Sequence, residues 1–163
     1  MDSVYLCGPI SGLGKREMTV WRNEAKSRLV KVGYRVHDPL TGEKDLWPEH
    51  NIDSKHKTKC PPSVAGATLA KDMAQVINSD IIIANLKGAI KVSIGSCFEL
   101  AWGLILNKYC IVVKGKRGVH AHPWIDKSQR FKIYSTMEAA LDHLVLLRSD
   151  VIPGREIDVN GTV

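Results

Sequence analysis

Short apolar runs alternate with segments of helical periodicity along most of this chain. The runs predict strands, and the segments between them predict helices with apolar residues at intervals of three and four. The predicted strands are Val4 to Cys7, Tyr34 to Val36, Ile81 to Leu86, Tyr109 to Val113 and Phe131 to Tyr134, and the predicted helices are Arg16 to Lys31, Val64 to Asn78, one that opens at Ser93, and Thr136 to Leu147. Such alternation is typical of an α/β protein with one parallel sheet.

The length of 163 residues suits one domain with its own hydrophobic core. We expect residues 1–147 to form that domain and residues 148–163, which hold only isolated Val and Ile, to form a carboxyl-terminal tail. Residues 40–63 are polar and rich in turn formers. A connection of that length is typical of a lid, a binding loop or a disordered segment.

Cysteine usage and hydropathy limit the class of protein. The four cysteines are scattered and form no CxxC pair, which favours reduced thiols in a cytoplasmic protein over a disulfide framework or a zinc site. No apolar run approaches the roughly 20 residues that a membrane span needs. The start of the chain does not resemble a signal peptide.

The net charge of +6 has two interpretations. Part of the excess lies in residues 55–59 and 114–117, which are clusters of the kind that meet nucleic acid. No aromatic residues are interleaved with them, as a single-strand binding platform requires. The charge therefore favours a solvated surface or a small phosphorylated ligand over a nucleic acid polymer.

Glu99 is the conspicuous residue of the third predicted helix. The helix is apolar on almost every side, which is typical of a buried helix, and a buried carboxylate must be paired, protonated or turned toward a cavity. Gly95 and Gly103 lie four residues to either side, on the same helix face. We expect open space above the carboxylate that suits a ligand. The alternative is that Glu99 lies at a frayed edge or pairs with a core arginine.

The loop from Gly8 to Gly14 joins the first strand to the first helix. Its glycines, Ser11 and the following helix N-terminus suit an anion, although a tight turn would look the same. At the other candidate positions the alternatives also stay open. Trp47 could stack on a base or pin its loop to the core. His120 and His122 could chelate a metal, but a solvated loop is the simpler interpretation.

Three pieces of the sequence together match a known family. They are Tyr5-Leu6-Cys7-Gly8-Pro9-Ile10, the segment from Asp72 to Asp80 with its following strand, and Ser93-x-Gly95-Ser96-x-x-Glu99-Leu100-Ala101. Together they resemble the nucleoside 2-deoxyribosyltransferase family, which includes the related deoxynucleoside 5′-monophosphate N-glycosidases. The match covers about residues 3–147, apart from residues 40–63.

The resemblance implies a flavodoxin-like (Rossmann-like) sheet of about five parallel strands with helices on both faces. It implies that Glu99 is the nucleophile that attacks the sugar, that Asp72 assists the leaving base, and that Tyr5 orients Glu99. No cofactor or metal is implied. The expected substrate-binding residues are Gly8, Pro9, Ile10, Ser11, Gly12, Trp47, Ser93, Gly95 and Ser96. Family members form homodimers or larger homo-oligomers with shared active sites, and residues 120–124 are the candidate contribution from a neighbouring subunit.

Ser93 departs from the transferase pattern, in which an aspartate six residues before the glutamate holds the 5′-hydroxyl of the sugar. The monophosphate glycosidases resemble this chain in having serine there, and a serine can donate to a phosphate that an aspartate would repel. Ser93, Ser96, Ser11, the amides of residues 12–14 and Lys15 or Arg16 could form a phosphate pocket. The carboxyl-terminal tail of this chain does not match the usual carboxyl end of the transferases. Transferase, hydrolase and non-catalytic nucleotide sensor therefore remain alternatives.

Overall fold

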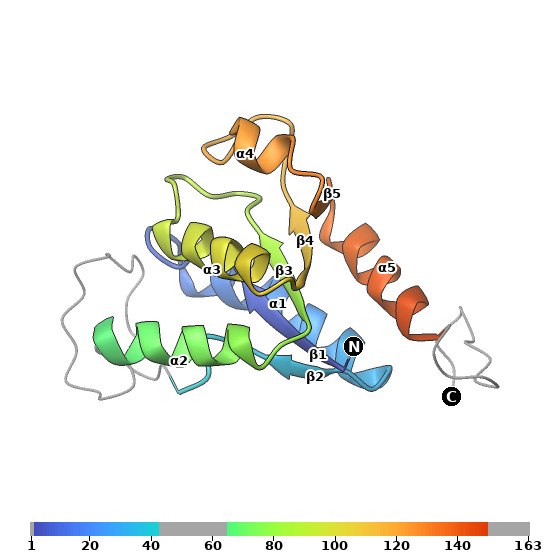
Figure 1. Ribbon diagram of the computed structural model, residues 1–163. Helices are drawn as coiled ribbons and strands as arrows, with labels where there is room; N and C mark the ends of the chain where they lie inside the picture. The colour runs from blue at the N-terminus through green and yellow to red at the C-terminus, as the bar shows by residue number, and fades with distance from the viewer. Residues whose placement is uncertain (1, 43–64, 150–163) are drawn as a thin grey trace.

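The computed structural model describes residues 2–42 and 65–149, which build a sheet flanked by helices (Figure 1). The five strands pair in the order β2-β1-β3-β4-β5, and every pair is parallel. The strands are β1 (Ser3–Cys7), β2 (Arg35–His37), β3 (Ile81–Asn85), β4 (Tyr109–Val113) and β5 (Phe131–Tyr134). The helices are α1 (Lys15–Lys31), α2 (Ala65–Ile77), α3 (Ile94–Ile105), α4 (Pro123–Asp126) and α5 (Met137–Ser149). The predicted parallel α/β sheet is confirmed.

Alternating side chains of the central strands divide the core between the two faces of the sheet. In β1, Val4 and Leu6 pack with residues of α1 and α5, whereas Tyr5 and Cys7 pack with residues of α2 and α3. The same alternation runs through β3 and β4, because successive side chains of a strand point to opposite faces. The alternation therefore directs the Tyr5 side chain to the face on which α3 lies.

The strand order changes direction between β1 and β3. The chain leaves β1 toward β2 on one side of the sheet and then crosses over to β3 on the other. This is the flavodoxin-like order, and in such sheets ligands bind beyond the carboxyl ends of the strands at the point where the order reverses. The loop after β1 and the loop between β3 and α3 both lie at that point.

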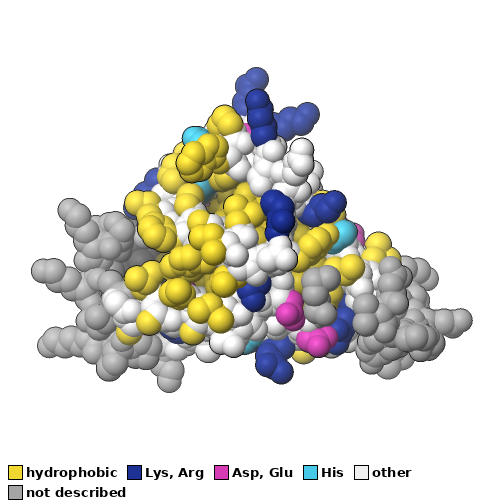
Figure 2. Space-filling model, in the orientation of Figure 1, with side chains coloured by type: hydrophobic (Ala, Val, Ile, Leu, Met, Phe, Trp, Pro, Cys, Tyr) yellow, Lys and Arg dark blue, Asp and Glu magenta, His cyan; other side chains and the backbone are white. Residues whose placement is uncertain are grey.

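The apolar sequence of α3 predicted a helix buried on every side, but one side of α3 is exposed. Ile94, Phe98 and Ile105 expose 70%, 54% and 81% of their surface. Leu100 and Gly103 on the opposite side are buried against the sheet. A helix in an outer layer of an α/β fold turns only one side toward the sheet, so its outer apolar residues are left exposed in the single chain. They form part of a hydrophobic surface over α2, α3 and α4 (Figure 2).

The prediction that Gly103 leaves open space is wrong. A Cβ atom there would lie 2.5 Å from Ile82 Cδ1 and 2.9 Å from Cys110 Sγ. Gly103 therefore lets α3 pack closely on β3 and β4. A Cβ at Gly95, in contrast, would meet nothing within 4 Å, so the space beside Glu99 lies on the amino-terminal side of the helix alone.

Other differences from the predicted elements are small. Helix α4 lies within residues 114–130, which were expected to form a loop, and α5 continues to Ser149. Within residues 2–42 and 65–149, no helix has the length and hydropathy that crossing a membrane requires. Trp47 and residues 150–163 of the predicted tail lie outside the described residues.

Candidate active site

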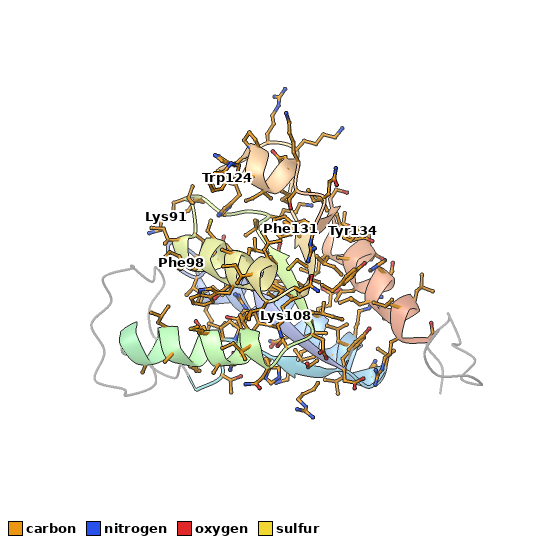
Figure 3. All side chains as sticks on the ribbon, in the orientation of Figure 1. Lys91, Phe98, Lys108, Trp124, Phe131 and Tyr134 are labelled. Atoms are coloured by element: carbon orange, nitrogen blue, oxygen red, sulfur yellow. The ribbon has the colours of Figure 1, made fainter. Side chains whose placement is uncertain are left out.

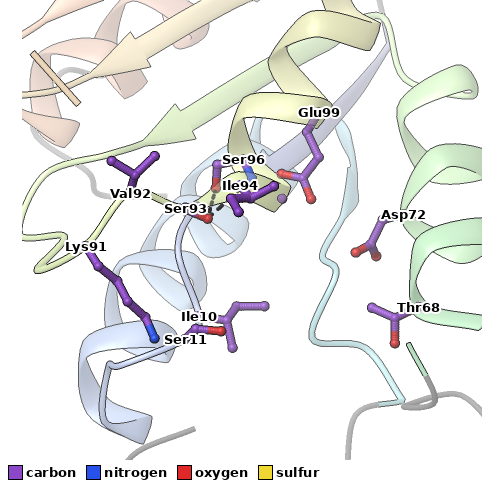
Figure 4. A pocket seen from close by; sticks show the side chains of 12 residues that line it. Ile10, Ser11, Thr68, Asp72, Lys91, Val92, Ser93, Ile94, Ser96 and Glu99 are labelled. Carbon is purple, nitrogen blue, oxygen red and sulfur yellow. Dashed lines mark hydrogen bonds between the residues drawn. The ribbon is translucent and has the colours of Figure 1, made fainter. Parts of the chain in front are cut away.

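A cavity of about 380 Å³ opens at the carboxyl ends of β1 and β3 (Figure 4). The loop after β1, the inner side of α2 and the first turns of α3 form its walls. Its volume is in the range of sites that hold small molecules. The lining residues are Gly8, Ile10, Ser11, Thr68, Asp72, Lys91, Val92, Ser93, Ile94, Gly95, Ser96 and Glu99. Eight of the residues proposed from the sequence are thus brought together in one cavity.

Glu99 lies at the inner end of this cavity and is only 8% exposed. The Tyr5 hydroxyl donates a hydrogen bond of 2.8 Å to Glu99 Oε1, while Oε2 has no hydrogen-bond partner among the described residues. Burial raises the pKa of the Glu99 carboxyl above its ordinary value, and the neighbouring Cys7 thiol and the Tyr5 hydroxyl partly offset this effect. The carboxylate is thus held through one oxygen at the wall of the cavity, an arrangement that suits a nucleophile.

Tyr5 is a fully buried residue of β1. Its own burial and the negative charge of Glu99 raise the pKa of the phenol. The hydroxyl therefore stays protonated at neutral pH and acts as the donor in its bond to Glu99. Through this bond, β1 fixes the orientation of a side chain that belongs to α3.

Asp72 projects from α2 on the opposite wall of the cavity. Figure 4 shows its carboxylate turned toward the space below Glu99, with Thr68 one turn earlier on the same helix. The two carboxylates therefore face one space from two different helices. A molecule bound in that space would meet Glu99 on one side and Asp72 on the other.

The first turn of α3 supplies hydroxyl groups and a helix N-terminus. Ser93 is the N-cap residue, and its Oγ accepts a hydrogen bond of 3.3 Å from the backbone N–H of Ser96. The two serine Oγ atoms lie 2.9 Å apart. Serine is a preferred N-cap residue, and the N-terminus of a helix attracts anions.

Arg22 of α1 holds the loop after β1 in place. This arginine is fully buried, and its guanidinium donates to the carbonyl oxygens of Gly8 at 2.9 Å and Met18 at 2.7 Å. Its Nε lies 3.7 Å from Asp38 Oδ1, just beyond β2. Because Gly8 lines the cavity, this buried charge supports the cavity wall. The sequence signal for Arg22 was its position on the buried side of an amphipathic helix.

Some residues proposed from the sequence lie outside the cavity lining. Pro9 is buried within the loop, and Gly12 has a φ of +83°, a conformation that glycine adopts easily. Both residues shape the loop that carries Ile10 and Ser11. Lys15 and Arg16 do not line the cavity either. Trp47 lies outside the described residues.

Lys91 and Thr68 line the cavity although the sequence did not single them out. The Lys91 side chain crosses close to Gly12, and its ammonium group lies beside Ser11 in Figure 4. Lys91 thus brings the positive charge that was expected from Lys15 or Arg16. Its only sequence signal was its place in the connection between β3 and α3.

His120 and His122 do not line this cavity. His120 Nε2 accepts a hydrogen bond from the backbone of Ser93, and His122 caps the short helix α4. The described part of the chain holds no group of three histidine, cysteine, aspartate or glutamate side chains placed to bind a metal ion. Cys7, Cys97 and Cys110 are free thiols.

Comparison with known proteins gives one family and a set of similar folds. The model of the family described as nucleoside 2-deoxyribosyltransferase matches residues 4–160. No curated protein matches the chain. A 2-deoxyribosyltransferase from Bacillus psychrosaccharolyticus has a similar structure, with a TM-score of 0.61 and 16% identity over 86% of this chain and 90% of that one.

Two further solved structures share the fold. A 2-deoxyribosyltransferase from Leishmania mexicana has a TM-score of 0.56 and 15% identity, covering 90% of this chain and 98% of that chain. A conserved protein from Enterococcus faecalis V583 has a TM-score of 0.58 and 13% identity, covering 90% and 99%. At these identities the structural likeness concerns the fold alone.

Proposed function

The chain belongs to the nucleoside 2-deoxyribosyltransferase family, and on that premise we propose that Glu99 is the nucleophile with which it cleaves the N-glycosidic bond of a 2′-deoxyribonucleoside or its 5′-monophosphate. Membership makes it an enzyme of the class that breaks N-glycosidic bonds. One observation supports the assignment most strongly. A buried carboxylate, oriented by the Tyr5 hydroxyl at 2.8 Å, faces a cavity with Asp72 on its opposite wall.

In the first step of the proposed reaction, a carboxylate oxygen of Glu99 attacks C1′ of the sugar. The bond between C1′ and the base nitrogen breaks, its electron pair leaves with the base, and Asp72 supplies a proton to the base. The sugar is then an ester of Glu99. In the second step, water or another base attacks C1′, gives its proton to Asp72 and frees Glu99, so two displacements retain the configuration at C1′.

The reaction is tested by incubating the protein with each 2′-deoxyribonucleoside and each 5′-monophosphate, with and without an acceptor base, and separating the products by chromatography. We expect free base from at least one substrate. A new nucleoside in the presence of acceptor identifies a transferase, and free sugar or sugar phosphate identifies a hydrolase. Absence of base release from every substrate would contradict the proposal, and tight binding without release would identify a nucleotide sensor.

The cavity favours a substrate that carries a 5′-phosphate. Ser11, Ser93 and Ser96 supply hydroxyl groups, α3 supplies its N-terminus, and Lys91 supplies a positive charge within the same cavity. Such groups together suit an anion and would gain little from an uncharged 5′-hydroxyl. Among the forms that family membership allows, we therefore propose the 5′-monophosphate.

Replacing Lys91 with glutamine tests this choice. We expect KM for the monophosphate to rise by about tenfold or more, because a hydrogen bond to a charged group is lost, while kcat changes little. KM for the corresponding deoxynucleoside should stay near its original value. Steady-state kinetics on the two substrates measures the difference. An equal rise for both substrates would place the phosphate elsewhere.

We propose that the exposed apolar surface is the contact between subunits of a homo-oligomer. Its members are Leu69, Met73 and Ile77 of α2, Ile94, Phe98 and Ile105 of α3, and Trp124 of α4, each at least 40% exposed. Figure 3 labels Phe98 and Trp124 within it. Apolar surface of this extent is typical of an interface between proteins. Residues 120–124 remain the candidate contribution to a neighbouring subunit's cavity.

The variant Ile105→Asp is expected to dissociate the oligomer, because an unpaired carboxylate buried at an interface is costly. Ile105 is 81% exposed in the single chain and lies at the end of α3 away from the cavity. Sedimentation velocity measures the molecular mass. Val30→Asp, on α1 at the opposite face of the sheet, is the matched control. Monomeric wild-type protein at micromolar concentration would contradict the assignment.

A further inference from the structure

His120 lies in the connection between β4 and α4 and is only 4% exposed. Its Nε2 accepts a hydrogen bond of 2.9 Å from the backbone N–H of Ser93. Its Nδ1 is buried without a hydrogen-bond partner among the described residues. Because Nε2 accepts a hydrogen bond from an N–H group, the imidazole is neutral and carries its own proton on Nδ1.

His120 contacts the start of α3, the helix that carries Glu99. Ser93 caps α3, its hydroxyl lies against that of Ser96, and both serines line the cavity. The backbone N–H of an N-cap residue precedes the helix and has no intrahelical acceptor. His120 supplies that acceptor, 27 residues further along the chain. The position of the serine pair therefore depends on a loop that does not itself line the cavity.

The surroundings of His120 favour its neutral form. It borders a second hollow of about 290 Å³ on another side of α3, which Cys97 and His122 also line. Lys114, at the end of β4, forms an ion pair of 2.5 Å with Asp126 of α4. Burial and the positive charge of Lys114 lower the pKa of His120 below its ordinary value of 6.5.

We propose that His120 is a positioning residue for the substrate cavity, and that its neutral imidazole holds the backbone of Ser93 so that the Ser93–Ser96 hydroxyl pair meets the 5′-phosphate of a bound nucleotide. This inference rests on the proposed function, since it concerns the phosphate end of the same cavity. It assigns the loop after β4 a role in substrate affinity. The reacting atoms lie near Glu99 instead, so the role is in binding more than in the chemical step.

Nucleotide affinity is measured in the Glu99→Gln background, in which a bound nucleotide should not be consumed. Each 2′-deoxyribonucleoside 5′-monophosphate and each deoxynucleoside is titrated by calorimetry. We expect His120→Phe, which keeps a ring but removes the acceptor, to raise Kd for the monophosphates about tenfold. Kd for the deoxynucleosides should change by less than about twofold. His120→Gln, whose amide oxygen can reach the position of Nε2, should restore monophosphate binding.

A structural role alone predicts a different pattern, in which both ligand classes weaken together and glutamine does not rescue. His143→Gln is the matched control, because His143 lies on α5 and contacts the Tyr109 hydroxyl, away from the cavity. Its Kd values should equal those of the parent protein. Unchanged monophosphate affinity in a folded His120→Phe variant would overturn the inference.

The pH dependence gives a second readout. As pH falls through the lowered pKa of His120, protonation of Nε2 removes the acceptor, so monophosphate affinity should fall. The ligand's own phosphate also titrates, with a pKa of about 6. In the His120→Gln variant the phosphate of the ligand still titrates, but the histidine is absent. Any difference between the pH profile of the variant and that of the parent protein is therefore due to His120. Superimposable profiles would contradict the proposal.

Nitrogen NMR of histidine-labelled protein tests the hydrogen bond without any ligand. The expected state at pH 7 is the neutral tautomer with its proton on Nδ1, and the other tautomer or an imidazolium would overturn the inference even if the variants failed to fold. Failure to bind any nucleotide or nucleoside would contradict the proposed function. Nucleotide binding that is insensitive to His120→Phe would contradict this inference alone.

Discussion

Replacing Glu99 with glutamine is expected to abolish base release and, at the same time, to make the folded protein more stable. The amide keeps the size of the side chain and can still accept from the Tyr5 hydroxyl, but it cannot form the ester with the sugar. We expect kcat to fall by about 10⁴-fold or more, in the range that removal of an enzymatic nucleophile produces. The loss should be similar for every substrate, because all of them need the same first step.

The gain in stability follows from the raised pKa of Glu99. Burial raises this pKa above its ordinary value of 4.5, so the folded protein binds the proton more tightly than the unfolded chain does. The stabilisation from that proton is fully present below the unfolded pKa and is lost as pH rises through the folded pKa. Above its folded pKa the wild-type protein keeps an ionised carboxylate buried, and the glutamine variant has no such charge at any pH.

Thermal unfolding across pH measures this effect. The melting temperature of Glu99→Gln should exceed that of the wild-type protein at pH 7, and the two should converge below about pH 4.5. Tyr5→Phe is the matched control, because it removes the hydroxyl donor while keeping the nucleophile. It should lower activity far less than Glu99→Gln and should not raise the melting temperature at pH 7.

Direct detection of the ester completes the test. Rapid acid quenching of the wild-type protein with substrate, followed by peptide mass spectrometry, should show a deoxyribosyl or phosphodeoxyribosyl adduct on the peptide that contains Glu99. The glutamine variant should show none. Base release by Glu99→Gln at a rate near that of the wild-type protein would remove Glu99 from the mechanism.

The strands of the fold could be predicted from the sequence because apolar runs in a parallel sheet are local signals. β4 and β5 have the predicted bounds, Tyr109–Val113 and Phe131–Tyr134. The surroundings of α3 were less predictable. An apolar composition does not distinguish a helix in the centre of a domain from one with an exposed apolar side, and the described chain leaves Phe98 and Ile105 exposed.

The cavity was predicted in part. Glu99, Asp72 and Ser93 had signals in spacing and family resemblance, and the fold brings them to one cavity. Lys91 had no such signal, because a lysine in a loop is usually a solvated residue and only the path of the loop after β3 brings it beside Ser11. The close packing of Gly103 on the sheet could not be predicted either, because the sequence does not give the distance between a helix and the strands beneath it.

Arg22 and His120 show a further limit of sequence reasoning. Each supports the cavity through a backbone group of another segment, Gly8 in one case and Ser93 in the other. Because the partner group belongs to the backbone, the side chain at the partner position gives no sign of the hydrogen bond in the sequence. The role of such a residue becomes visible only when the fold shows which backbone group it contacts.

Replacing Asp72 with asparagine is expected to lower kcat by about 10²- to 10⁴-fold, the range for loss of a general acid. Asparagine keeps the size of the side chain and can hydrogen-bond the base, but it has no proton to give. The loss should depend on the leaving group. An ordinary base leaves as an anion unless it is protonated, so it needs the acid in the transition state.

If the protein cleaves a purine substrate, the form methylated at N7 separates these roles, because its base already carries a positive charge and leaves as a neutral molecule. We expect Asp72→Asn to cleave this substrate at nearly the wild-type rate, while Glu99→Gln still fails to cleave it. The rates are compared by following base release under single-turnover conditions. If Asp72→Asn lost the same factor on both substrates, Asp72 would position the base without protonating it. If the methylated substrate rescued both variants, bond cleavage would not require attack by Glu99, and the ester would have no place in the reaction.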